Sequence, residues 1–211
     1  MMPLILKLKK ARHKEVAIAQ DLIVEELYTV FEKAVLHGGT AIWRCYQGNR
    51  FSEDIDAYLP RDLPKVNVFF ENLEKKGFSI IKKKISEHSI FSELQLKSVA
   101  VRFEAIFKQK DGSLKEYETA DGNLITVYTL TPEELVAEKI NAYLARLKIR
   151  DLYDVFFLLR HVKTKEEVAK DVGKLLNNFK SPADKEELKV LVITGLVPDV
   201  KKMLDYIKRW M

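Results

Sequence analysis

The segment from residue 37 to residue 56 decides the fold, and it reads His37-Gly-Gly-Thr-Ala-Ile-Trp-Arg-Cys-Tyr-Gln-Gly-Asn-Arg-Phe-Ser-Glu-Asp-Ile-Asp56. The apolar stretch from Ala34 to His37 is typical of a short strand that runs into the glycine pair. Residues 47–53 are mostly polar and indicate a loop, and a second strand is expected over residues 54–59. The segment therefore predicts two strands joined by a helix and a loop, with glycines ending one strand and acids on the other.

The glycine pair has a physical use if the protein binds phosphates. Because Gly38 and Gly39 lack a Cβ, their backbone N–H groups can approach phosphate oxygens closely. A helix that opens at Thr40 would add unpaired N–H donors and a favourable dipole. Taken alone, a glycine pair after a strand is most often a plain turn.

The acids of the second strand point to a metal ion. Asp54 and Asp56 are two residues apart, so on a strand both side chains face the same way. Two adjacent carboxylates repel each other unless a cation neutralises them, and Mg²⁺ favours one or two carboxylates together with substrate phosphates. An Asp-x-Asp pair alone is common on exposed strands, but its occurrence after the glycines in this order favours phosphoryl transfer.

The rest of the chain divides near residue 130. A helix is expected over residues 14–34 and another over 65–76, and strands are expected at 78–85, 98–108, 115–119 and 124–128. Asp111-Gly112 has the composition of a hairpin turn. Thr131-Pro132 is a helix start, and helices are expected over about 132–147, 149–161, 164–178, 183–195 and 198–209. This pattern predicts a mixed α/β domain, residues 1–130, and a helical lobe, residues 131–211.

The motifs resemble those of the polymerase-β-type nucleotidyltransferase superfamily, and more narrowly those of the AbiEii/AbiGii toxins of type IV toxin–antitoxin systems. The resemblance covers roughly residues 36–160 and rests on four elements in order: Gly38-Gly39-Thr40, Arg50-x-Ser52-x-Asp54-Ile55-Asp56, Glu138-Lys139-x-x-Ala142 and Arg150-Asp151-x-x-Asp154. It implies an α/β (α+β) nucleotidyltransferase core with a mixed sheet, followed by a C-terminal helical lobe.

The resemblance also implies roles for individual residues. Phosphate and nucleotide contacts fall to Gly38, Gly39, Thr40, Arg50, Ser52 and Lys139. Asp54 and Asp56 become metal ligands, and Asp151 completes the helical part of the site beside Lys139. A third carboxylate is expected on a neighbouring strand, where Glu104 is the best candidate. Pairing of Glu104 with Arg102 or a lysine is the alternative explanation.

The implied reaction is attack by an acceptor hydroxyl on an NTP, with Mg²⁺ or Mn²⁺ as the cofactor and RNA, specifically the tRNA 3′ end, as the acceptor. The implied role is that of a toxin neutralised by a cognate antitoxin protein. Two alternatives use the same fold: transfer of a nucleotide to a protein or small molecule, and a non-catalytic binding module. No RNA-recognition signature of a known RNA-binding module is present, so the RNA acceptor rests on the resemblance.

Composition limits the surroundings of the protein. The formal net charge is +5, which suits a polyanionic partner but equally suits a basic protein that contacts none. Cys45 is the only cysteine, which excludes an intramolecular disulfide and favours a reducing compartment. The apolar stretch at residues 3–6 is too short for a signal-peptide core, and no run approaches the ~20 apolar residues of a membrane span. A cytoplasmic protein with no membrane partner is expected.

Overall fold

The computed structural model describes residues 3–211, which divide into two compact units. The first, which we call the sheet unit, comprises the chain up to Gln47 together with Ser52–Thr129. The second, the helical unit, comprises Leu130–Met211 together with the short segment Gly48–Phe51. The segment that follows the glycine helix thus belongs to the helical unit, although the residues on both sides of it belong to the sheet unit.

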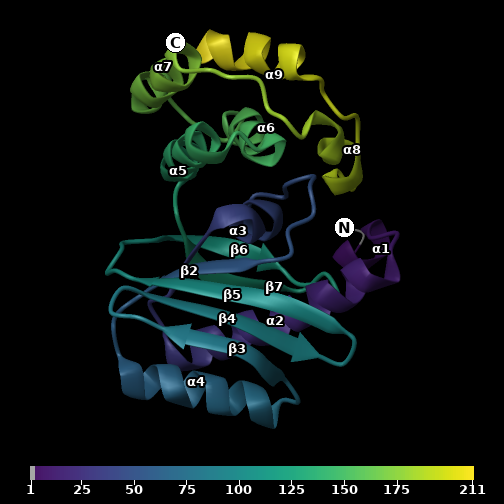
Figure 1. Ribbon diagram of the computed structural model, residues 1–211, viewed down its shortest axis with the longest axis vertical. Helices are drawn as coiled ribbons and strands as arrows, with labels where there is room; N and C mark the ends of the chain where they lie inside the picture. Colours follow the sequence, from purple (N-terminus) through teal and green to yellow (C-terminus); the bar gives the residue numbers. More distant parts are fainter. Residues whose placement is uncertain (1–2) are drawn as a thin grey trace. The chain divides into compact units, whose positions relative to one another are not determined.

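Seven strands of the sheet unit form one mixed sheet within the described residues, in the order β3-β4-β5-β2-β1-β7-β6 (Figure 1). Their bounds are Val35–His37 (β1), Ile55–Leu59 (β2), Ser79–Ile85 (β3), Ser89–Leu96 (β4), Val99–Phe107 (β5), Ser113–Glu118 (β6) and Leu124–Thr129 (β7). Strand β2 pairs antiparallel with β1 but parallel with β5, and β1 pairs parallel with β7. The predicted mixed α/β fold is confirmed.

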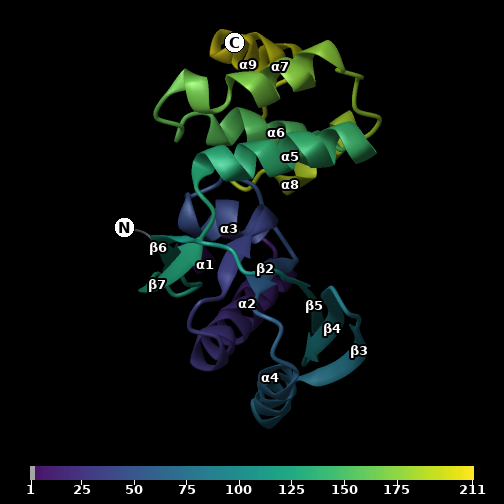
Figure 2. The same ribbon diagram turned by 90° about the vertical axis from the view of Figure 1, so that its left-hand side faces the viewer.

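The two faces of the sheet differ in how far helices cover them. Along β2 and β5 the buried side chains alternate with partly exposed ones, as expected for strands with one face against a core. Helix α2 (Ala11–Val30) and helix α4 (Leu63–Lys75) pack on the buried face, where the Phe69 ring lies 5.0 Å from that of Phe103. In Figures 1 and 2 both helices lie on one side of β3, β4 and β5. Asp56 and Glu104 belong to the opposite, less covered face.

The middle of the chain differs from the expectation at two places. Strand β4 lies between the strands expected over residues 78–85 and 98–108 and is additional to them, and its buried positions Ile90, Ser92 and Leu94 include a serine. Asp111-Gly112 does not close a hairpin, because β5 pairs with β2 and β4 whereas β6 lies at the far edge of the sheet. The turn at Asp121-Gly122 does join a true hairpin, β6 and β7. A turn dipeptide therefore predicts a change of chain direction, but it does not predict that the two flanking strands pair with each other.

Two helices of the sheet unit begin at residues that favour a helix start. A short helix α1 (Leu4–Lys7) precedes α2, and α4 begins at an Asp62 cap, whose carboxylate accepts a hydrogen bond from the Lys65 backbone. Helix α3 (Gly38–Cys45) begins at the glycines themselves, two residues earlier than expected. Both glycines thus form the first turn of α3, directly after β1.

The helical unit begins with a capping box. The Thr131 hydroxyl accepts a hydrogen bond from the Glu134 backbone, while the Glu134 carboxylate accepts one from the Thr131 backbone. The helices that follow are α5 (Pro132–Arg146), α6 (Ile149–Leu158), α7 (Ala169–Asn177), α8 (Leu188–Leu191) and α9 (Val200–Ile207). Among residues 3–211, no helix has both the length and the apolar character required to cross a membrane.

Candidate active site

The first turn of α3 lies against an acid of β2. Gly38 has φ +71°, a conformation that residues with a Cβ rarely adopt, and a Cβ built on it would lie 2.0 Å from Asp56 Oδ2. His37, the residue before it, pairs in register with Asp56. Glycine at position 38 is therefore required twice, by its backbone conformation and by the space that the Asp56 carboxylate occupies.

A buried glutamine links α3 to the strand that carries the acids. Gln20 of α2 donates from Nε2 to the Ser52 carbonyl oxygen at 2.9 Å and approaches Thr40 Oγ1 at 3.4 Å. The Thr40 hydroxyl in turn donates to the backbone carbonyl of Asp54. Thr40 is buried, and its hydroxyl holds the backbone of Asp54 in place. The predicted contact of Thr40 with phosphate would therefore involve its backbone N–H rather than its hydroxyl.

Strand pairing brings the third predicted acid to the other two. Glu104 of β5 is the register partner of Asp56 in the parallel β2–β5 pair, so both side chains are on the same face. Asp54 lies directly before β2, and its side chain is also partly exposed. Asp56 and Glu104 therefore lie side by side on the less covered face of the sheet unit, with Asp56 next to Gly38, and Asp54 directly precedes β2.

An arginine shares this group of acids. Arg102 lies 3.6 Å from Asp54 through Nε and 3.4 Å from Glu104 through Nη1, and about half of its side chain is exposed. The expected alternative for Glu104, a pair with Arg102, is thus present together with the register to Asp56. A solvated guanidinium at these distances is weakly held and can move aside.

The residues fit a divalent cation by their chemistry. Within residues 3–211, no three acidic, histidine or cysteine side chains form a ready-made cation site. The donor set is nonetheless one that Mg²⁺ or Mn²⁺ favours, since Asp54, Asp56 and Glu104 all supply carboxylate oxygens. The missing Cβ of Gly38 leaves the Asp56 carboxylate room on that side. Substrate phosphates would supply the remaining oxygen ligands.

The other predicted site residues form a buried cluster in the helical unit. Arg50 donates to both carboxylate oxygens of Asp154, at 2.5 Å from Nε and 2.5 Å from Nη2. Lys139 Nζ lies 3.0 Å from Asp154 Oδ2 and 3.7 Å from Asp151 Oδ1. Arg146 completes the cluster with hydrogen bonds of 2.7 and 2.8 Å to Asp151. Three cations thus share two fully buried carboxylates.

The cations of the cluster lower the pKa of one of its acids, Asp154. Burial opposes ionisation of Asp154, but the Arg50 and Lys139 charges outweigh it and lower the pKa of this carboxyl below its ordinary value. Both Asp151 and Asp154 are buried completely and face cations, so their direct partners are protein groups. Arg50 is likewise buried and committed to Asp154, a partner that the sequence did not indicate.

Comparison of the sequence with protein families gives one match, over residues 22–189, to the nucleotidyl transferase AbiEii toxins of type IV toxin–antitoxin systems. The chain belongs to the AbiEii family. It is thus a nucleotidyltransferase toxin by family, and the recognition made from its motifs is confirmed. A comparison with curated proteins found no match.

Solved structures agree with the AbiEii assignment at the level of fold. MenT4, a nucleotidyltransferase toxin from Mycobacterium tuberculosis, is 19% identical with a TM-score of 0.65, and the match covers 98% of this chain and 90% of that one. JHP933 from Helicobacter pylori is 17% identical with the same TM-score, over 95% of this chain and 90% of that one. The expected polymerase-β-like nucleotidyltransferase fold is confirmed.

Sequence reasoning missed two residues of this AbiEii-family site. Gln20 falls on the apolar stripe of α2 together with Val16, Ile23 and Leu27, and all four are buried. A single amide within an apolar stripe was the signal that could have marked it as a structural hydrogen-bond donor. Arg102 was considered only as a partner of Glu104, whereas it contacts Asp54 as well.

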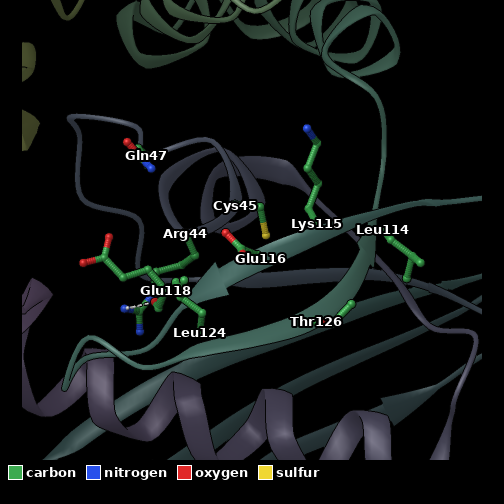
Figure 3. Close-up of a pocket in the computed structure, with 9 residues that line it drawn as sticks. All are labelled: Arg44, Cys45, Gln47, Leu114, Lys115, Glu116, Glu118, Leu124 and Thr126. Atoms are coloured by element: carbon green, nitrogen blue, oxygen red, sulfur yellow. Dashed lines mark hydrogen bonds between the residues drawn. The ribbon is translucent and has the colours of Figure 1, made fainter. Parts of the chain in front are cut away.

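A cavity of about 420 Å³ lies apart from the predicted site residues, beside the end of α3 and strands β6 and β7 (Figure 3). Arg44 and Cys45 line it, and Arg44 donates to the Glu118 carbonyl at 3.0 Å. Burial raises the pKa of the Cys45 thiol to about 12, so the thiol is protonated near neutral pH.

Proposed function

We propose that this AbiEii-family protein transfers a nucleoside monophosphate from an NTP to the terminal hydroxyl of an RNA acceptor, specifically the 3′ end of tRNA, and that this reaction is its toxic activity. The observation that carries the proposal is the register pairing of Asp56 with Glu104 beside Asp54 and against Gly38. A group of three carboxylates on an open sheet face suits a reaction in which a cation and phosphates meet an incoming hydroxyl.

Asp54, Asp56 and Glu104 would hold Mg²⁺ or Mn²⁺, which on binding would neutralise phosphate charge and polarise the phosphorus under attack. The first turn of α3 would cradle the phosphates with the backbone N–H groups of Gly38, Gly39 and Thr40. Arg102 would leave the acids and become free to contact a phosphate, since the incoming cation takes over its role. The acceptor hydroxyl oxygen would form a bond to the α-phosphorus and lose its proton to solvent. The bond from the α-phosphorus to the bridging oxygen would break, and pyrophosphate would leave with its electron pair.

Residues of the helical unit would act in two ways. Lys139 would contact the triphosphate, as the family implies, while Asp151 and Asp154 orient its ammonium group. Arg50 would act through Asp154 as a positioning residue, because its guanidinium is buried against that carboxylate. Ser52 would lie beside the nucleotide, with its backbone held by Gln20. A cognate antitoxin would neutralise the enzyme by binding it.

Labelled NTPs test the proposal directly. Each α-labelled NTP is incubated with the full chain and Mg²⁺ or Mn²⁺, with total tRNA, total protein or small-molecule acceptors in separate reactions. We expect label in tRNA, and at least a hundredfold less with Asp56→Asn, about 2.7 kcal/mol in the barrier. Glu74→Gln on α4, an exposed acid of the helix on the other face, is the matched control and should keep full activity.

The other arms decide between the alternatives. Label only in protein or a small molecule would contradict the RNA acceptor while leaving nucleotidyl transfer intact. Growth inhibition that survives Asp56→Asn would favour the non-catalytic binding module. Loss of growth inhibition together with loss of transfer supports the proposed toxin reaction.

A further inference from the structure

Strand register builds a single row of side chains across the less covered face of the sheet. Lys84 of β3 pairs with Phe91 of β4, Phe91 with Glu104 of β5, Glu104 with Asp56 of β2, and Asp56 with His37 of β1. Register partners point to the same face, so the row starts with a lysine and a phenylalanine and leads into the acids. Figure 1 looks onto this part of the sheet, with α2 behind the strands.

The β3 end of the row combines positive charge with an aromatic ring. Lys82, two residues from Lys84 and on the same face, holds its ammonium 4.9 Å from the centre of the Phe91 ring. Lys82 and Lys84 are exposed, and Phe91 is partly exposed. A cation–π contact at an exposed site is worth only about 0.5–1 kcal/mol, so a ligand that stacks on the ring can displace the lysine. Lysines next to an exposed ring are the composition of a single-strand nucleic-acid platform.

We propose that the 3′-terminal single strand of the RNA acceptor lies across this row, stacking a base on Phe91 and placing phosphates near Lys82 and Lys84. This inference rests on the proposed RNA acceptor and names the surface that would deliver it. An acidic protein segment fits less well, because the row continues directly into three carboxylates, whereas a polynucleotide whose last hydroxyl must react there has a reason to approach them.

The dimensions suit a short single strand. Neighbouring strands are about 4.8 Å apart, so Lys84 on β3 lies about 14 Å from Asp56 on β2, three strands away. With a stacked rise of about 3.4 Å per nucleotide, the row accommodates at most about four nucleotides. The surface can therefore guide a terminal overhang to the acids.

The chain provides its own control. Lys83 lies between the two platform lysines but points to the other face, where its ammonium is 4.9 Å from the centre of the Phe70 ring of α4. Lys83→Ala removes the same charge from the same strand without changing the row. Phe91→Trp keeps a stacking surface that Phe91→Ala removes.

The experiment measures binding of a labelled twelve-nucleotide single-stranded RNA to the full chain by anisotropy at several salt concentrations. We expect Lys82→Ala/Lys84→Ala to weaken binding about tenfold and to reduce the slope of log affinity against log salt by about 1.4. Phe91→Ala should weaken binding at least about fivefold and Phe91→Trp should restore it. Lys83→Ala should stay within about twofold. NTP affinity, measured separately, should be unchanged in all four variants.

The outcomes test whether Lys82, Lys84 and Phe91 form an RNA-binding platform. Equal losses in Lys83→Ala and the double variant would reduce the effect to net charge and overturn the proposal, as would unchanged binding by Phe91→Ala. Variants that bind RNA normally but lose a protein partner would assign the row to that protein instead. If Asp56→Asn abolishes transfer while the platform variants bind and react like wild type, the platform fails and the proposed function stands. If transfer goes only to a protein acceptor, the proposed RNA acceptor fails, and the role of the row in delivering it fails as well.

Discussion

Replacement of Arg50 by alanine should destabilise the helical unit strongly. Arg50 and Asp154 form a bidentate pair in which both side chains are almost completely buried, at 6% and 1% exposure. Removing one partner of a buried pair costs about 3–5 kcal/mol, because the other charge loses its compensation. Lys139 stays 3.0 Å from Asp154 in the variant, so we expect the lower end, about 3 kcal/mol.

The loss is measured by urea unfolding and located by hydrogen exchange. With a slope of about 2 kcal/mol per molar urea, the midpoint should fall by about 1.5 M. Peptides from α6 should lose protection, because Asp154 belongs to this helix, while peptides from α2 should keep theirs. Arg160→Ala is the control: the guanidinium of this exposed arginine lies over the Phe156 ring, and its removal should cost less than about 1 kcal/mol.

The pH dependence of the unfolding free energy provides a second test of the Arg50–Asp154 pair. Because the pKa of Asp154 is lowered in the folded protein, its contribution is present above the unfolded value of about 3.9 and is lost as the pH falls through the folded value. In Arg50→Ala the Asp154 carboxyl loses the positive charge that most strongly offsets the effect of its burial. Its pKa should therefore rise, and acid unfolding should begin at a higher pH. A variant within 1 kcal/mol of wild type, with an unchanged acid transition, would refute the assignment of Arg50 to a buried structural pair.

Two further substitutions test the backbone around the sites. Gly38→Ala should lower transfer at least tenfold while the protein stays folded, because the added Cβ would displace the Asp56 carboxylate. Gly173→Ala is the control, since a Cβ at that position meets nothing within 4 Å, and it should leave transfer in the labelled-NTP assay unchanged. A fully active Gly38→Ala would contradict the close approach of Gly38 to Asp56. Thr131→Ala should lower the unfolding free energy in urea by about 1 kcal/mol, because it removes the side-chain half of the capping box with Glu134, and an unchanged midpoint would show that the cap contributes nothing.

The fold class was predictable because its signals are local. Alternation placed Asp54 and Asp56 on one face, and the composition of the Thr131 helix start predicted the cap that the structure has. Strand partners carry no such local signal: the pairing of Asp56 with Glu104 joins residues 48 positions apart, and nothing within either segment encodes it. Glu104 was found as an isolated acid in an apolar run, and its register with Asp56 emerged only in three dimensions.

The same limit explains why Arg50 and Gln20 were not understood. Arg50 lies in a polar loop, and the family resemblance implies a nucleotide contact for it. Its pairing with the distant Asp154 makes it a buried residue. Gln20 sits within an apolar helix stripe whose periodicity hides a single polar member. Long-range hydrogen bonds and ion pairs have no period along the chain, so pattern analysis cannot detect them.

The position of Gly48–Phe51 has a consequence for dissecting the protein. This segment belongs to the helical unit although it lies between two stretches of the sheet unit, so the chain passes between the units three times. A fragment cut at residue 130 would retain Arg50 without Asp154 of α6, and would expose a charge that the intact chain buries. Neither unit is a detachable module, and swapping the helical portion with that of a relative would have to carry these four residues along.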